Sequence, residues 1–148
     1  MKTRSRFYFF FFVFLVSFLP VSHAKNTERM RVTILIASNQ GSDYDLVNDA
    51  YRDQLIKLFS YSSYHETGSF FRNLKKAERE KVDLPEGYEL VLTLQGKEKD
   101  RVFVQALIRK QGTQYVDTVL SILKPGVVFL GGPQVAVGSL IIILEAGF

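Results

Sequence analysis

Three consecutive segments of the chain alternate between apolar and polar side chains, and this alternation restricts the fold more than any other feature. Successive side chains of a β-strand point to opposite faces of a sheet, so a period of two gives each strand one apolar face. Short turns that contain glycine separate the segments, which predicts an antiparallel meander with one face covered. The apolar positions are Tyr88, Leu90, Leu92 and Leu94, then Val102, Val104, Ala106 and Ile108, then Val116, Leu120 and Ile122.

Two further segments are apolar at almost every position. Arg31–Ala37 reads RVTILIA and Ser139–Leu144 reads SLIIIL. A strand that is buried on both faces has this composition and lacks the period of two. We expect two such strands, over residues 32–37 and 140–144, to lie side by side at the centre of the sheet.

A helix is predicted over residues 42–59. Ser42 and Asp45 have the spacing of a capping box. Apolar residues then recur every three or four positions, which places one apolar stripe along a helix that faces the sheet. The stripe consists of Leu46, Val47, Ala50, Tyr51, Leu55, Leu58 and Phe59.

The remaining segments predict further strands. Tyr61–His65 is rich in aromatic and hydroxyl side chains, as strands are. Residues 127–130 predict a strand that Gly131-Gly132-Pro133 breaks. Residues 75–81 are hydrophilic and mixed in charge, and they fit either a short helix or an exposed edge strand.

These segments together predict an α+β fold with one mainly antiparallel sheet of about six to eight strands and one amphipathic helix packed across it. Residues 31–148 form a single domain, and residues 25–30 (KNTERM) form a polar leader in front of it. The chain has no cysteine. Its stability must therefore come from burial of apolar side chains, without disulfides.

The first 24 residues have the three parts of a signal peptide. Lys2, Arg4 and Arg6 are followed by the apolar run 7–21, and Ser22-His23-Ala24 supplies small residues for cleavage. The apolar run is shorter than the roughly 20 residues that span a bilayer. We expect cleavage after Ala24 and a periplasmic or secreted product with no stable membrane anchor; a retained anchor is the alternative.

Removal of the signal changes the charge of the protein. The whole chain has 19 Lys and Arg against 15 Asp and Glu, a formal charge of +4. Three of these bases and none of the acids lie in the signal, which leaves 16 against 15 and a charge of +1. A nearly neutral domain lacks the electrostatic footprint of a nucleic-acid binder, so we expect no nucleic-acid partner.

We predict no catalytic residue, cofactor site or metal site. His65 is the only histidine after cleavage, and Ser63 shares its strand face, but the chain has no Gly-x-Ser-x-Gly elbow and too few histidines for a zinc site. The acidic cluster continues into the predicted helix, so capping and solvation explain it better than a calcium loop does. That cluster consists of Asp43, Asp45, Asp49 and Asp53.

Two segments are candidates for contact with a partner or ligand. Tyr61 and Tyr64, near Phe70 and Phe71, favour either a stacking surface or ordinary packing under the helix. The Gly-Gly-Pro segment permits close approach of a partner's backbone, and it also suits a turn. The candidate surface residues are Tyr61, Tyr64, His65, Gly131, Gly132 and Pro133.

The segments YRDQLIKLF at residues 51–59 and YSSY at residues 61–64, with a meander that closes on Gly131-Gly132-Pro133, resemble a group of small exported bacterial proteins of uncharacterised function. The likeness covers most of residues 31–146. It implies a bacterial envelope setting and supplies no catalytic residues. The segment KPGVVFLGG at residues 124–132 also resembles a stretch of secretin channel proteins. The chain departs from that pattern at Pro133, and it lacks the rest of the secretin domain.

The leading hypothesis is a non-enzymatic exported module, binding or structural, whose partner is another envelope protein. Edge strands of a half-open sheet offer one route, by strand addition. The alternatives are a small hydrolase that acts on envelope polymers through carboxylates or His65, and a lipid or small-ligand carrier with a pocket between helix and sheet. The oligomeric state stays open.

Overall fold

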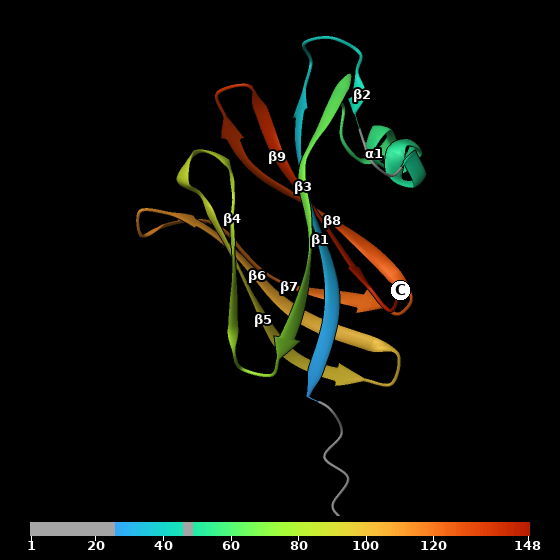
Figure 1. Cartoon of the computed structure of the whole chain (residues 1–148), viewed down its shortest axis with the longest axis vertical. Coiled ribbons are helices and arrows are strands. Elements are labelled where there is room, and N and C mark those ends of the chain that lie inside the picture. The colour runs from blue at the N-terminus through green and yellow to red at the C-terminus, as the bar shows by residue number, and fades with distance from the viewer. Residues whose placement is uncertain (1–25, 46–48) are drawn as a thin grey trace, which may run out of the picture.

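The three alternating segments form the predicted meander. In the computed structural model, which describes residues 26–45 and 49–148, strands β5 (Glu89–Glu98), β6 (Arg101–Lys110) and β7 (Thr113–Leu123) pair antiparallel in sequence order (Figure 1). Strand β4 (Arg79–Asp83) pairs with the other side of β5. The result is a four-stranded sheet with the order β4-β5-β6-β7.

A second sheet contains the two continuously apolar segments. Its order is β2-β3-β1-β9-β8, and every pair is antiparallel except β2 with β3. As predicted, the apolar strands β1 and β9 are neighbours inside the sheet, with Ile34 opposite Ile142. The strands are β1 (Thr27–Ser38), β2 (Tyr44–Asp45), β3 (Ser63–Lys75), β8 (Gly126–Val135) and β9 (Gly138–Ala146), and the helical segments are η1 (Asp49–Tyr51), α1 (Arg52–Leu58) and η2 (Pro85–Gly87).

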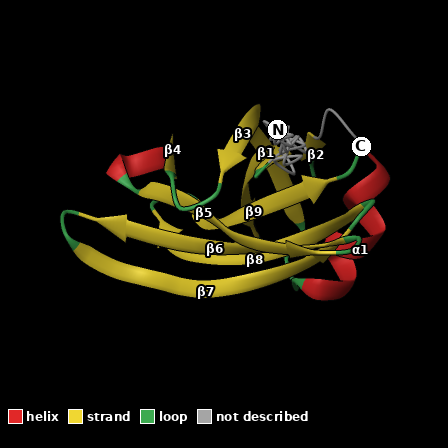
Figure 2. Cartoon of the chain, turned by 90° about the horizontal axis from the view of Figure 1, so that it is seen from below, coloured by secondary structure: helices red, strands yellow, loops and turns green. Residues whose placement is uncertain are grey.

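The structure therefore has two sheets instead of the single sheet that the sequence predicts. The apolar face of the meander packs against one face of the five-stranded sheet, and helix α1 lies at one end of the molecule (Figure 2). A single short helix is too small to cover the apolar faces of all these strands, so the second sheet covers the first. The fold is mostly β, with α1 as its α-helix in the described residues.

The core has two layers, one on each face of the five-stranded sheet. The larger layer lies between the sheets and includes Val32 and Leu144 from one sheet and Leu92 and Val104 from the other. The smaller layer lies under α1, where the buried Leu55 meets the outer face of the sheet. The central strands are thus buried on both faces over residues 32–37 and 140–144, which explains why these segments lack a polar face. The sheet residues of the smaller layer are Leu35, Ala37, Tyr64, Ile141 and Ile143.

The helix is shorter than predicted. Tyr44 and Asp45 form strand β2, which pairs with Tyr64 and His65, so the expected helix start is strand. The capping box is absent, because α1 begins after Tyr51 without a side-chain cap. Residues 46–48, which include two members of the predicted stripe, lie outside the described residues. Backbone pairing with the edge of β3 outweighs the capping signal in this segment.

The polar leader also differs from the prediction. Strand β1 already begins at Thr27, and Met30 is fully buried between the sheets. Residues 27–30 alternate between exposed and buried side chains, and Glu28 is one of the buried ones. The sequence does not indicate that this segment is a strand, because the buried position 28 is occupied by a charged glutamate. The predicted signal, residues 1–24, lies outside the described residues.

Two other segments are now assigned. The hydrophilic residues 75–81 contain the end of β3, a turn and the start of β4, so the edge-strand interpretation is correct for its second half. The Gly131-Gly132-Pro133 segment does not break a strand. Strand β8 continues through it with a shift in register between Gly131 and Gln134, which is a bulge.

A buried ion cluster ties the two sheets together at one end. The Glu28 side chain, which is 7% exposed, lies 2.7 Å from Lys97 Nζ on β5 and 3.1 Å from Lys124 Nζ after β7. Burial alone raises the pKa of the Glu28 carboxyl. The hydrogen bonds and charges of both lysines outweigh burial and hold this pKa below its ordinary value of 4.5.

We expect Glu28→Gln to lower the free energy of unfolding at pH 7 by roughly 1–3 kcal/mol, because it removes the negative charge that two lysines share. A lowered native pKa means that the stabilisation is present above about pH 4.5 and is lost as the pH falls through the native pKa. Urea unfolding of both proteins between pH 7 and pH 3 measures the difference.

The matched control is Glu78→Gln. The Glu78 carboxylate pairs with Lys75 at 3.6 Å on the surface, and both side chains are exposed. Its loss should change little at any pH. Equal effects of the two substitutions would show that the Glu28 cluster does not hold the sheets together.

Candidate functional site

Tyr64 is a packing residue. It is fully buried under α1, and its hydroxyl donates to the carbonyl oxygens of Leu55 at 3.0 Å and Phe59 at 2.8 Å. Both carbonyls lie at the end of α1, and the Leu55 carbonyl also accepts a hydrogen bond from the Phe59 N–H at 2.8 Å. Burial raises the pKa of Tyr64, so the hydroxyl stays a donor. Of the two sequence interpretations, packing under the helix is therefore correct for Tyr64.

Tyr61 and the Gly-Gly-Pro bulge lie close together. The Tyr61 hydroxyl is 2.6 Å from Ser139 Oγ, which also accepts a hydrogen bond from the Gln134 side chain at 2.6 Å. Gln134 directly follows Pro133 in the bulge. The structure thus joins two of the predicted segments through Ser139, a buried residue that the sequence analysis did not single out. All three polar groups are occupied by one another.

His65 lies on the opposite strand face from Tyr64. Its Nδ1 is 2.8 Å from Asp45 Oδ2 across the β2–β3 pair, and both side chains are mostly exposed. A carboxylate that orients an imidazole provides two of the three members of a hydrolytic triad, and the third is a nucleophile. In the described chain, however, no serine or threonine hydroxyl hydrogen-bonds to His65. The same part of the chain also holds no group of three His, Asp or Glu side chains that could bind a metal ion.

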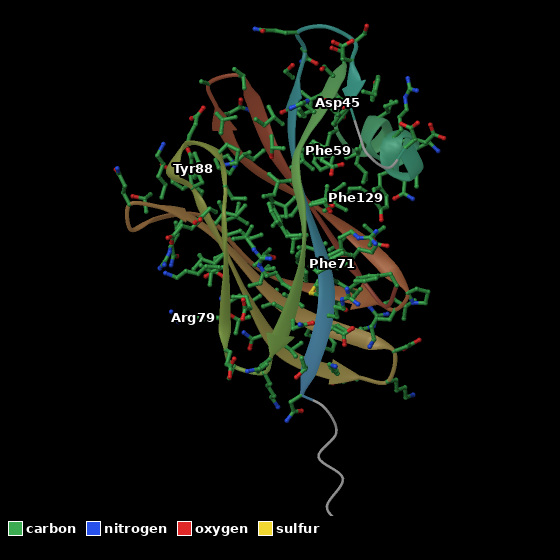
Figure 3. All side chains as sticks on the ribbon, viewed as in Figure 1. Asp45, Phe59, Phe71, Arg79, Tyr88 and Phe129 are labelled. Atoms are coloured by element: carbon green, nitrogen blue, oxygen red, sulfur yellow. The ribbon has the colours of Figure 1, made fainter. Side chains whose placement is uncertain are left out.

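The most distinctive surface was missed by the sequence analysis. It lies on the outer face of the five-stranded sheet, beyond the area that α1 covers, and we call it the Arg–Phe patch: Arg29, Arg31, Phe71 and Phe148. The rings of Phe71 and Phe148 lie 5.4 Å apart, and each is 48% exposed. Figure 3 shows Phe71 further along β3 than the residues packed against α1, such as Phe59 and Phe129.

Both arginines of the patch stack on both rings. The guanidinium of Arg29 lies 4.5 Å from the Phe71 centroid and 5.7 Å from that of Phe148. The guanidinium of Arg31 lies 5.1 Å and 4.9 Å from the same centroids. These contacts follow from the register, because Arg31 is directly opposite Phe71 and positions 29 and 31 share a strand face. The sequence alone does not give the register between β1 and β3, so it does not show that Phe71 lies next to the two arginines.

The two arginines of the patch differ in their carboxylate partners. Glu145 on β9 pairs with Arg31 Nη1 at 3.0 Å and hydrogen-bonds to the Tyr51 hydroxyl. Burial and the Glu145 carboxylate together raise the pKa of Tyr51 to about 12, so this hydroxyl stays protonated at ordinary pH. Glu145 is thereby engaged by two donors. Within the described residues, Arg29 has no carboxylate partner.

The predicted aromatic group is split between two places. Tyr61 and Tyr64 pack edge to face under α1 with their centroids 6.4 Å apart. Phe71 belongs to the Arg–Phe patch, and Phe70 points to the other face of β3, where the Arg72 guanidinium lies 5.3 Å from its centroid. The exposed rings therefore flank the edge of β3, and each is stacked with arginine.

The space between helix and sheet is filled by side chains. Leu55 and Phe59 occupy it from the helix side, and Tyr64 occupies it from the sheet. A hollow of about 330 Å³ lies elsewhere, on the surface at the β5–β6 hairpin, lined by residues 95–98 and Phe103. In the described part of the chain, no helix is long and apolar enough to cross a membrane.

Comparison with known proteins gives no family assignment. A scan against protein-family models finds no match, and searches of curated proteins and of solved structures find none either. The function of the site has to be argued from its own geometry.

The bulge offers a test of the structural role of its glycines. A Cβ at Gly132 would lie 3.0 Å from Leu140 Cβ and 3.2 Å from the Leu140 carbonyl oxygen, in the core. We expect Gly132→Ala to lower the free energy of unfolding by about 1–3 kcal/mol through this overpacking. Thermal and urea unfolding of the purified variant measure it.

Gly131→Ala is the matched control. A Cβ at Gly131 meets the Phe59 ring at 3.5 Å, an ordinary contact. The change should stay within about 0.5 kcal/mol. If Gly132→Ala is tolerated as well as Gly131→Ala is, the bulge does not need glycine for packing, and its role as a surface for a partner's backbone gains support.

Proposed function

We propose that this chain is an exported, non-enzymatic binding module of the bacterial envelope that contacts a partner protein through the Arg–Phe patch. The exposed pair Phe71 and Phe148, stacked with two arginines, is the observation that carries the proposal. The resemblance to small exported bacterial proteins supports the envelope setting. The leader over residues 1–24 supports export.

The composition of the patch suits a protein interface. Aromatic residues and arginine are enriched at the centres of interfaces, where they contribute most of the binding energy. Stacking on the rings holds the guanidinium planes in place before a partner arrives, so less side-chain entropy is lost on binding. Arg29 then offers free donors to a carboxylate. The partner surface that fits is apolar with at least one acidic side chain.

The hydrolase alternative rests on one observation, the His65–Asp45 pair. That pair lies on an exposed edge, whereas hydrolytic sites exclude water and provide a nucleophile next to the base. If activity on an envelope polymer were found and were lost in His65→Ala, the hydrolase would replace the binding module as the leading proposal.

The test is photo-crosslinking in intact cells. A photoreactive phenylalanine analogue at position 71 keeps an aromatic ring in the patch and should give one defined adduct whose partner is identified by mass spectrometry. Arg29→Glu in the same protein should reduce the yield of this adduct about tenfold, because the reversed charge repels an acidic partner.

The control places the analogue at position 137, since Val137 is also an exposed apolar residue, 62% accessible, in the β8–β9 turn. The absence of an adduct from position 71, or equal adducts from both positions, would contradict the proposal. Edman sequencing of the protein from the same cells tests the export premise: a chain that still begins at Met1 in the cytosol would remove it.

A further inference from the structure

The strand edges of the fold differ in how well they are protected. Within the described chain, β2, β4, β7, β8 and the part of β3 beyond residue 65 each have an unpaired side. Unpaired edges invite pairing with another chain, and natural proteins prevent it with short strands, basic residues, prolines or bulges. These devices are present on four of the five edges.

The protected edges each show a recognisable device. Strand β2 has two residues, and β4 has five, with Arg79 and Lys81 among them. The open part of β3 carries Arg72 and Lys75. Strand β8 contains the bulge at residues 131–133 with its proline.

Strand β7 has almost none of these devices. Thr113–Leu123 (TQYVDTVLSIL) is 11 residues long and has no lysine, arginine, proline or glycine. Its one register shift against β6 lies at the start, before Val116, and pairing is regular from there to Leu123. Val119 on its outer face is 58% exposed.

The neighbouring seam of the sandwich is also open. Strands β7 and β8 meet at the turn of residues 124–125 and run apart from it (Figure 1). The inward side chains Val116 and Leu120 on β7 are only partly buried, as are Val128 and Leu130 on β8. A strand added along β7 would cover apolar side chains that the monomer leaves half exposed.

We propose that β7 pairs with β7 of a second copy of this chain, antiparallel, about a two-fold axis through Val119. A two-fold axis normal to the sheet preserves the faces of each strand, so only residues of the same face can stand opposite each other. This restricts the symmetric registers to those centred on a residue.

The charge of Asp117 selects one of these registers. With the axis at Val119, Asp117 stands opposite Ser121 of the second copy, Val116 opposite Ile122, and Val119 opposite itself. An axis at Thr118 or Leu120 would place Asp117 opposite Val119 or Leu123, and an axis at Asp117 would oppose two carboxylates. Of these four registers, only the first places Asp117 opposite a neutral polar residue and Val119 opposite an apolar one, while Thr118 then stands opposite Leu120.

Sedimentation velocity of the purified full chain over a range of concentrations tests the dimer. The native protein should form a reversible dimer, and Val119→Lys should be monomeric because it places two ammonium groups at the axis. Val137→Lys, an equally exposed site in the β8–β9 turn, should remain dimeric. Circular dichroism melting confirms that each variant is folded. A native protein that stays monomeric, or a folded Val119→Lys that stays dimeric, overturns the proposal.

Two further variants test the register. Ser121→Asp keeps a partner in its own chain, because Arg101 Nη1 donates to Ser121 Oγ at 2.9 Å, yet it places an acid opposite Asp117 of the second copy. We expect it to weaken the dimer about tenfold. Because the chain has no cysteine, Val119→Cys provides a single thiol. A short bismaleimide should crosslink two copies of this variant through position 119. The same reagent should not crosslink two copies of Val137→Cys. A dimer that withstands Ser121→Asp and does not crosslink through position 119 contradicts the β7 register.

Discussion

The burial of β1 and β9 on both faces is the constraint on which the rest of the fold depends. The parts of these strands that are apolar at nearly every position, residues 32–37 and 140–144, need cover on both faces. The meander supplies a whole sheet for the inner face, while the outer face receives only α1 and the aromatic residues that flank it: Tyr44, Tyr51, Phe59 and Tyr61. The two coverings are unequal in size. The helix therefore leaves part of the outer face open.

The Arg–Phe patch occupies that uncovered area. Going along β1 from the helix toward its start, the outward side chains change from Leu35 through Thr33 to Arg31 and Arg29. The hydroxyl of Thr33 bonds to Ser69 at 2.9 Å and marks the boundary between the two regions. Beyond it, the guanidinium groups of Arg29 and Arg31 lie over the rings of Phe71 and Phe148, and Arg31 also pairs with Glu145. The patch begins where the core under α1 ends, and it is the surface through which we propose that a partner binds.

The sequence predicts the parts of this fold whose signal is local. The meander follows from the period of two in its apolar residues. The double burial of β1 and β9 and their adjacency follow from two continuously apolar segments. Register, in contrast, is a long-range property, and it decides that Arg31 meets Phe71 while Tyr61 and Tyr64 do not. The same holds for Glu28, whose burial depends on Lys97 and Lys124 from distant segments. Strand pairing also explains the short helix, because the edge of β3 takes Tyr44 and Asp45 away from it.

Exposure of an apolar side chain does not by itself indicate a contact surface. Ile56 and Leu58 on α1 and Val137 in a turn are exposed singly, as is common in soluble proteins. Phe71 and Phe148 differ because they are in contact with each other and carry stacked charge. Val119 differs because it lies on a long strand whose backbone is unpaired on one side. Since the patch is on the five-stranded sheet and β7 is the edge of the other sheet, one contact can form without the residues of the other. A dimer through β7 would therefore display two patches, and two weak contacts with one partner assembly would add as a bivalent interaction.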